Sequence, residues 1–326
     1  MPSAVSTIIR LFREAGGDYI SGTAISRETG ITRSAVWKHI TALRETGYII
    51  DAVPSRGYRL ASVPDILSEE EIRNSLDTTV FGSRLVCLET TASTNAAAFR
   101  LAEEGAPEGC VVVADTQSAG KGRLGRVWLS PPSVNLYCSV VLRPPVMPHQ
   151  APQLTFLSAV ATVRAITRTT ALAPEIKWPN DVIINGRKVA GLLNEMSAET
   201  DGINFVILGI GVNLNMTGDQ FPPDLRTPGT SLKIESGCAV NRAFFAACLL
   251  NELDLLYREF LEQGFEPVRA AWQQHCTARG RMVSVSNGGS EEFRGHFAGV
   301  DSDGAMLLAL PDGRLQRVLC GDAKVI

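Results

Sequence analysis

The 326-residue chain lacks the sequence features of several large protein classes. It has no run of 18 or more apolar residues, so no membrane-spanning helix is expected. Its start, Met-Pro-Ser-Ala-Val-Ser-Thr, has neither the basic nor the apolar segment of a secretory signal. The seven cysteines are scattered and never spaced Cys-x-x-Cys, which argues against a disulfide framework or a zinc site. These absences predict a cytoplasmic protein with reduced thiols and no membrane contact.

Charge is present in ordinary amount but is unevenly placed. Charged residues make up 20% of the chain and hydrophobic residues 45%, as in soluble globular proteins, and the length allows two or three domains. The net charge is −3. Residues 1–62 carry eight Lys/Arg and five Asp/Glu, a balance of +3, so the remainder carries −6. A positive N-terminal segment favours a partner such as nucleic acid.

Residues 1–62 read as three short helices followed by a hairpin with Pro54–Gly57 at its tip. Helices are expected near 7–14, 23–29 and 31–46, and apolar residues at 36, 40 and 43 give the third one buried face. In a helix-turn-helix, the opposite face of that helix reaches base edges and phosphates. The candidate DNA contacts are Arg33, Ser34, Lys38 and Arg56. A small helical domain used for protein contacts is the alternative.

The rest of the chain divides at a change of pattern. After a short linker at 61–66, helical and strand patterns mix over residues 67–276, which favours an α+β fold with a mixed sheet over a doubly wound one. Residues 277–326 contain short strands separated by Asn-Gly-Gly, Asp-Ser-Asp-Gly and Pro-Asp-Gly turns. That pattern predicts a small all-β barrel, which at about fifty residues needs to dock on the central domain.

The most distinctive motif is the loop Gln117-Ser-Ala-Gly-Lys-Gly-Arg-Leu-Gly-Arg-Val-Trp128, with three glycines and three cations between Gly120 and Arg126. Glycines let a backbone approach an anion closely, and the cations can neutralise it. We therefore expect a loop that closes over a phosphorylated or carboxylated small molecule. A mobile, solvated basic loop is the alternative.

Three familiar nucleotide-binding patterns fail at this loop. The dinucleotide fingerprint needs a helix next, whereas Pro131-Pro132 and a strand-like run over 135–142 follow here. The kinase pattern needs His-Arg-Asp and Asp-Phe-Gly, and neither occurs. A Walker loop needs Ser or Thr after the lysine, but Gly122 follows Lys121.

Polar and glycine motifs elsewhere complete the pattern. Ser-Thr-Asn at 93–95 opens a helix and offers donors to a ligand, or merely caps the helix. Lys177 lies between an apolar strand and Trp-Pro, where partial burial calls for an anion, either a ligand or Asp181. Glycines at 191 and within 209–215 admit a flat ligand or serve tight strand packing.

Taken together, these motifs resemble those of biotin protein ligases in order and spacing. The terminal segments extend the resemblance to the bifunctional bacterial form, which also represses biotin synthesis genes. The resemblance implies a winged helix-turn-helix over 1–62, a class II synthetase-like catalytic domain with a mixed sheet over 67–276, and an SH3-like β-barrel over 277–326.

The resemblance also implies an activity. Biotin and ATP, with Mg²⁺, would give biotinyl-5′-AMP, and biotin would pass to a lysine of the biotin carboxyl carrier protein of acetyl-CoA carboxylase. The adenylate would promote a homodimer that binds operator DNA. Lys177 and Arg123 would be catalytic, and the metal ligands stay open. Biotin would contact Ser93, Thr94, Asn95, Gln117, Lys121, Gly122, Arg123, Lys177 and Gly191. ATP or the adenylate would contact Lys121, Arg123, Arg126, Trp128, Lys177, Asn180 and Asn213.

Three rival functions stay open at this stage. A lipoate ligase shares the catalytic fold, but lipoate has no ureido group, so the polar cluster at 93–95 with Gln117 favours biotin. A ligand sensor without catalysis would not need Lys177 and Arg123. A ligase whose winged helix no longer binds DNA is the third. The loop has Lys121 where many family members have arginine, and Leu124 where a further cation is common, which bears on affinity and adenylate retention.

Overall fold

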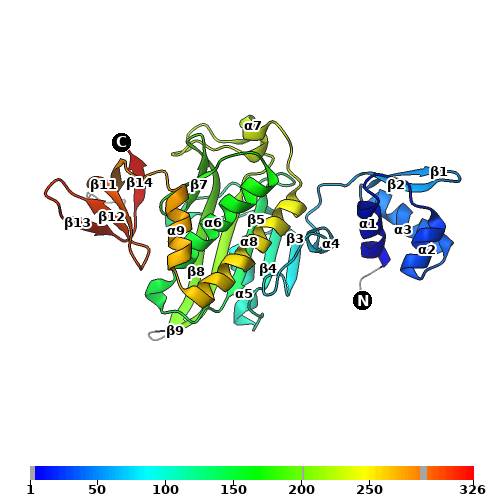
Figure 1. Cartoon of the computed structure of the whole chain (residues 1–326), viewed down its shortest axis with the longest axis horizontal. Coiled ribbons are helices and arrows are strands. Elements are labelled where there is room, and N and C mark those ends of the chain that lie inside the picture. The colour runs from blue at the N-terminus through cyan, green and yellow to red at the C-terminus, as the bar shows by residue number, and fades with distance from the viewer. Residues whose placement is uncertain (1–3, 200–201, 287–291) are drawn as a thin grey trace. The chain divides into compact units, whose positions relative to one another are not determined.

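The computed structural model describes residues 4–199, 202–286 and 292–326 and divides into two compact units, Met1–Ile66 and Leu67–Ile326 (Figure 1). Each unit is described by itself. Within the described ranges, no helix combines the length and the apolar character needed to cross a membrane.

The first unit is a helix-turn-helix with a two-stranded wing. Its elements are α1 (Ala4–Glu14), α2 (Gly22–Thr29), α3 (Arg33–Glu45), β1 (Ile49–Val53) and β2 (Gly57–Ser62). These elements confirm the three helices and the hairpin expected from the sequence.

Local sequence signals set the bounds of α2 and α3. Ser21 Oγ accepts a hydrogen bond from the Ala24 amide at 3.1 Å and begins α2, while Gly30 with φ 69° ends it. Thr32 Oγ1 caps α3 in the same way, 3.2 Å from the Ala35 amide. One apolar core holds the unit together: Ile8, Ile9, Phe12, Ile25, Val36, Ile40, Leu43, Tyr48 and Ile50.

The second unit is built on a seven-stranded sheet in the order β3-β4-β5-β9-β8-β7-β6. Only the β3–β4 pair is parallel among the printed pairings of these strands; the other neighbours are antiparallel, so the mixed sheet expected from the sequence is confirmed. The strands are β3 (Leu85–Thr91), β4 (Val111–Gln117), β5 (Leu136–Leu142), β6 (Glu175–Lys177), β7 (Asp181–Ile184), β8 (Arg187–Glu199) and β9 (Gly202–Val212).

The two faces of this sheet are covered unequally. The long helices α6 (Gln153–Thr169) and α8 (Arg242–Gln263) lie along one face (Figure 1). On the other face, α5 (Thr94–Glu103) packs on β4, β5 and β9. Side chains alternate accordingly: Val111 and Val113 join the core under α6 and α8, and Val112 joins the core under α5. The shorter helices are α4 (Glu69–Arg73), α7 (Leu232–Ser236) and α9 (Glu266–His275).

The C-terminal strands form an antiparallel sheet in the order β13-β12-β11-β10-β14. They are β10 (Met282–Ser286), β11 (Glu292–Val300), β12 (Met306–Ala309), β13 (Leu315–Val318) and β14 (Asp322–Val325). Within the described residues β13 and β14 stand at opposite edges, so the closed barrel expected from the sequence is not confirmed. Turn motifs mark where strands begin and end, but they do not determine whether two edges meet.

Aromatic packing and hydrogen bonds dock this sheet on the central one. Trp272 of α9 is fully buried, with its ring centroid 4.8 Å from that of Phe156 on α6 and 6.4 Å from that of Phe297 on β11. Arg269 Nη1 donates to the Val300 carbonyl at 2.9 Å. This docking brings β14 to the edge of a cavity described below.

Candidate active site

Three strands form an open floor beyond the N-terminus of α5. Val141 and Ile207 face α5, so residues two and four positions along β5 and β9 share that face. The strand register sets two rows across this floor: Ser139–Gly209–Leu193 and Tyr137–Gly211–Gly191. Glycines on the central strand leave space above it, and a cavity with about 470 Å³ of empty volume, open to solvent, lies there.

Polar side chains at the start of α5 form one wall of this first cavity. Ser93, Thr94 and Asn95 are all buried and all line it. Ser93 occupies the cap position but makes no capping hydrogen bond, so helix capping does not account for its hydroxyl. Instead Gln117 Oε1, at the end of β4, accepts from the Thr94 amide at 2.8 Å.

The glycine-rich loop folds as a small hairpin, which we call the lid (residues 120–128). The Trp128 amide donates to the Gly120 carbonyl at 2.9 Å, and the Gly122 amide donates to the Arg126 carbonyl at 2.7 Å. At the tip, Leu124 adopts φ 57° and is 70% exposed. Lys121 and Gly122 line the first cavity, as predicted for residues over a ligand, although Lys121 is otherwise exposed.

Trp128 packs the lid against the sheet. Its ring lies over two glycines, and a Cβ at Gly211 would lie 2.6 Å from the ring nitrogen while one at Gly191 would lie 2.9 Å from Cζ3. The ring lines both this cavity and a second one. Its Nε1 is buried and has no hydrogen-bond partner among the described residues, so it offers a donor to a ligand.

The second cavity adjoins the first and is larger, with about 1520 Å³ of empty volume open to solvent. Arg123 stands where the two join: its Nη1 donates to Asn180 Oδ1 at 3.0 Å, and Asn180 Nδ2 donates to the Leu192 carbonyl at 2.8 Å. Asn213, also predicted for the nucleotide, is buried in the wall and donates to the Thr230 carbonyl at 3.1 Å.

Lys177 projects into the second cavity from the end of β6. Its Nζ lies 3.5 Å from Thr227 Oγ1, and burial lowers the pKa of this ammonium, an effect that Asp181 partly offsets. Asp181 is paired instead with Lys188, at 2.6 Å between Nζ and Oδ1. Across the described ranges no carboxylate lies within ion-pair distance of Lys177, so a structural ion pair does not explain its burial.

Asp322 of β14, which the sequence did not single out, connects the C-terminal sheet to the lid. Arg126 Nη2 lies 2.7 Å from Asp322 Oδ2, and Arg226 on the cavity wall bonds the same carboxylate. Arg126 thus lies beside the second cavity and not the first. An isolated acidic residue in a short C-terminal strand carries no sequence signal for such a role.

We expect Asp322→Ala to raise roughly tenfold the KM for the ligand of the second cavity, which the sequence predicts to be a nucleotide, because charged hydrogen bonds to two arginines are lost together. The affinity for the ligand of the first cavity should change less than about twofold, since Asp322 does not line it. Asp312→Ala, which removes an exposed carboxylate paired with Arg314, is the control. An unchanged nucleotide KM in steady-state kinetics would contradict this role for Asp322.

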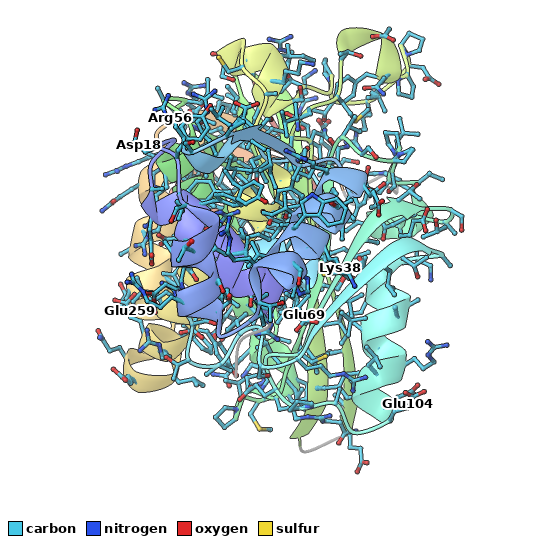
Figure 2. All side chains as sticks on the ribbon, turned by 90° about the vertical axis from the view of Figure 1, so that its right-hand side faces the viewer. Asp18, Lys38, Arg56, Glu69, Glu104 and Glu259 are labelled. Atoms are coloured by element: carbon cyan, nitrogen blue, oxygen red, sulfur yellow. The ribbon has the colours of Figure 1, made fainter. Side chains whose placement is uncertain are left out.

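The predicted DNA contacts belong to the first unit. Arg33, Ser34 and Lys38 are exposed on α3, and Arg56 is exposed at the wing with its guanidinium 4.3 Å from the Tyr19 ring centroid. Figure 2 labels Lys38 and Arg56. Trp37, which is not among the residues predicted from the sequence, is also 56% exposed on this helix. Trp37 precedes Lys38, follows Ser34 by three residues and lies off the buried stripe of the helix. This spacing places it on the same exposed face as the predicted DNA contacts, and the sequence alone could have indicated it.

Comparison with known proteins decides the family. A model of the biotin/lipoate A/B protein ligase family matches residues 87–213, and a helix-turn-helix domain model matches residues 5–59. The chain is 41% identical to the bifunctional ligase/repressor BirA of Bacillus spizizenii over 98% of this chain and 97% of that protein. The chain belongs to the biotin protein ligase family.

Other members of the biotin protein ligase family support this assignment. The bifunctional ligase/repressor BirA of Escherichia coli is 31% identical over 90% of this chain and 89% of its own length. The biotin protein ligase of Aquifex aeolicus, solved in complex with biotin and ATP, is 27% identical with a TM-score of 0.64, over 75% of this chain and 99% of that one. The likeness to a ligase/repressor thus spans both units of this ligase family member.

Proposed function

We propose that the chain activates biotin with ATP to biotinyl-5′-AMP and then transfers biotin to a lysine of a biotin carboxyl carrier protein. The observation that carries the proposal is the pair of adjoining cavities that meet at Arg123 and Trp128. The first, with the polar groups of Ser93, Thr94 and Gln117, suits the ureido ring. The second, with Lys177, suits the nucleotide, and the Aquifex aeolicus relative was solved with both biotin and ATP.

The meeting point of the cavities places the charges that the first reaction needs. The biotin carboxylate attacks the α-phosphorus of ATP, and pyrophosphate leaves, while both partners are negative. Arg123 and Lys177 offset this repulsion and the charge that develops in the transition state. Because Lys177 is half-buried, its charge is less screened than a surface lysine's.

The lid accounts for the second reaction. The uncharged amine of the acceptor lysine attacks the acyl carbon of the adenylate, AMP leaves, and the amine's proton passes to solvent. Water would hydrolyse the same mixed anhydride, so it must be kept out until the acceptor arrives. The Gly120–Trp128 hydrogen bond closes the hairpin of the lid, and the Arg123–Asn180 contact holds that hairpin against both cavities.

Mg²⁺ is a further part of the proposal. Among the described residues no group of three or more His, Cys, Asp or Glu could hold a metal ion by itself. Mg²⁺ is commonly held by one or two carboxylates together with substrate phosphates, and Asp181 and Asp224 line the second cavity. These residues fit an ion that arrives with ATP and neutralises its phosphates.

The test is ATP–pyrophosphate exchange with biotin or lipoate as the only acid, followed by biotin labelling of a carrier domain. We expect exchange with biotin and covalent labelling of one carrier lysine. Exchange with lipoate alone would favour the lipoate-ligase alternative. Tight biotin binding without exchange would favour a sensor.

We also propose that the first unit binds operator DNA as a repressor, supported by the helix-turn-helix match and by BirA relatives. The exposed face of α3 carries Trp37 beside Lys38, and an apolar ring in a major groove suits thymine methyl groups.

Trp37→Ala is expected to weaken DNA binding roughly tenfold, comparable to the loss of one base contact. Lys38→Ala should instead lower the salt dependence of binding by about one unit of slope. The probe is a duplex enriched from random DNA by the wild-type protein with biotin and ATP, measured by gel shift. Pyrophosphate exchange should stay unchanged in both variants. Equal DNA affinity of Trp37→Ala and wild type would contradict this contact.

Finer features of the family belong to the proposal as well. We propose a cytoplasmic enzyme, supported by seven free cysteines, with a class II synthetase-like centre and an SH3-like C-terminal domain. We further propose that the adenylate promotes homodimerisation, because the lid exposes Leu124 and Val127. Gel shifts that are insensitive to biotin and ATP would contradict that coupling.

A further inference from the structure

The chain leaves the lid through a short stem that has no part in the reaction described above. Pro131 and Pro132 follow the lid after two residues. Proline has no backbone N–H and its ring restricts φ, so this stretch is stiff and has no backbone donor of its own. The first backbone N–H after Ser130 is therefore that of Ser133. Whatever binds Ser133 fixes the exit of the lid.

Asp115, on β4, binds Ser133 through one carboxylate oxygen. Its Oδ2 accepts from the Ser133 amide at 3.1 Å and from the Ser133 hydroxyl at 3.2 Å. Ser133 adopts φ 61°, a left-handed conformation that costs free energy for a residue with a Cβ. Ser133 is also exposed, so burial does not keep it in this conformation. The hydrogen bonds to Asp115 stabilise it instead.

Arg242, the first residue of α8, holds Asp115 in turn. Its Nη1 lies 2.6 Å from Asp115 Oδ1, and the side chain of Arg242 is only 2% exposed. Asp115 continues the row of Val111 and Val113 on β4, which faces α6 and α8. A buried guanidinium needs acceptors, and the carboxylate that meets this need also binds Ser133. The contacts thus run from α8 through Asp115 to the stem of the lid.

Two more hydrogen bonds join the stem to the sheet. Thr116 Oγ1 donates to the Ser130 carbonyl at 2.7 Å, and Tyr137 Oη donates to the Pro131 carbonyl at 2.9 Å. Tyr137 is buried and lines the first cavity. Because the prolines are stiff, a displacement of Ser133 would pass through them to these two contacts. The position of Ser133 therefore bears on the wall of the first cavity.

We propose that Asp115 is a positioning residue: Arg242 holds it in place, and by binding Ser133 it keeps the lid closed. The inference rests on the proposed function for its chemical consequence, since an open lid admits water to the adenylate and lets it leave. A lid that is closed most of the time loses little of its closed population when its open population rises severalfold. Loss of the adenylate should therefore depend on Asp115 more than its formation does.

Asp115→Asn separates the two contacts of this residue. A guanidinium only donates, so the amide oxygen of the asparagine must face Arg242, and its NH2 group then faces the Ser133 amide. Two donors cannot bond, so the bond from the Ser133 amide is lost while Arg242 keeps an acceptor. Adenylate formed in a single turnover without carrier protein should be lost roughly tenfold faster than in wild type. Its rate of formation should fall less than about threefold.

Limited trypsin cleavage of the ligand-free full chain tests the anchor without substrates. Lys121, Arg123 and Arg126 are the trypsin sites of the lid. A protease cuts a segment that opens locally, so the cleavage rate follows the population of the open lid. Asp115→Asn should raise cleavage at these sites roughly tenfold, measured by mass spectrometry of the products. Failure of wild type to form an adenylate would overturn the proposed function, and cleavage would still decide whether Asp115 holds the lid.

Two further variants separate positioning from stability. Glu252→Gln removes the charge of another buried carboxylate on α8, which pairs with Arg168, and should leave adenylate loss and lid cleavage as in wild type. Ser133→Gly in the Asp115→Asn background should recover most of the lost retention, because glycine adopts positive φ without support. Mere loss of the ion pair of Arg242 would not be rescued at Ser133.

If Asp115→Asn does not fold, Ser133→Ala takes its place. It loses the hydroxyl contact but keeps the amide, so lid cleavage and adenylate loss should both rise about threefold. Equal lid cleavage in the variant and wild type would overturn the anchor. Faster cleavage with unchanged adenylate loss would overturn its link to the reaction. An equal rise of both rates in Glu252→Gln would also overturn the proposal, because the effect would then be one of global stability.

Discussion

Replacing Lys177 with alanine is expected to slow formation of the adenylate by about 10²- to 10³-fold, the usual effect of removing one charge that stabilises a transition state. Biotin should still bind within a fewfold, because Lys177 lines the second cavity and not the first. The measurement is ATP–pyrophosphate exchange at saturating biotin. Lys233→Ala, at an exposed lysine on α7, is the control and should match wild type.

The same lysine predicts the alkaline limit of the reaction. Burial lowers the pKa of Lys177, so its ammonium loses the proton at a lower pH than a surface lysine does. The protonated form is the active one, so the exchange rate should be level below that pKa and fall above it. In Lys177→Arg the fall of the rate at high pH should disappear, because a guanidinium stays protonated there. The exchange rate of this variant should be lower than that of wild type at every pH. If the exchange rate of Lys177→Arg fell at the same high pH as that of wild type, a group other than Lys177 would be titrating.

Gly209→Ala is expected to weaken the binding of biotin by roughly 100-fold, the effect of about 3 kcal/mol in an overpacked site. The added methyl would lie 2.2 Å from Asn95 Oδ1 and 2.6 Å from the Leu193 carbonyl oxygen. The backbone cannot yield cheaply, so Asn95 must leave its place in the wall of the first cavity. Biotin affinity by calorimetry and the thermal midpoint by scanning calorimetry are the measurements.

The matched control for this substitution is Gly218→Ala. Nothing lies within 4 Å of a Cβ at Gly218, and the residue does not line either cavity. Affinity and thermal midpoint should equal those of wild type. If Gly209→Ala also bound biotin as wild type does, biotin would not bind on the floor of the first cavity.

Local signals in the sequence were sufficient for much of the fold. Thr32 and Gly30 mark helix ends by capping and by left-handed backbone, and the apolar stripe at 36, 40 and 43 identifies the buried face of α3. These effects act within a few residues and can be read from one segment at a time.

Residues of the candidate site could be predicted only where a sequence motif contains the charged or polar side chains that the chemistry needs. The lid and Lys177 carry charges at unusual places, and the structure places them around two adjoining cavities. Asp322 was not predictable, because its role comes from a partner 196 positions away in the sequence. The closed C-terminal barrel was expected from turns alone, but edge pairing depends on strand curvature that turns do not encode.

The lid lies against both cavities, and that position has a thermodynamic consequence for the affinities of the two ligands. Gly122, Arg123 and Trp128 are walls of the first cavity and of the second. A ligand that fixes this shared wall changes the free energy of binding at the other site. The coupling is reciprocal: whatever factor bound biotin contributes to the affinity for ATP, bound ATP must contribute to the affinity for biotin.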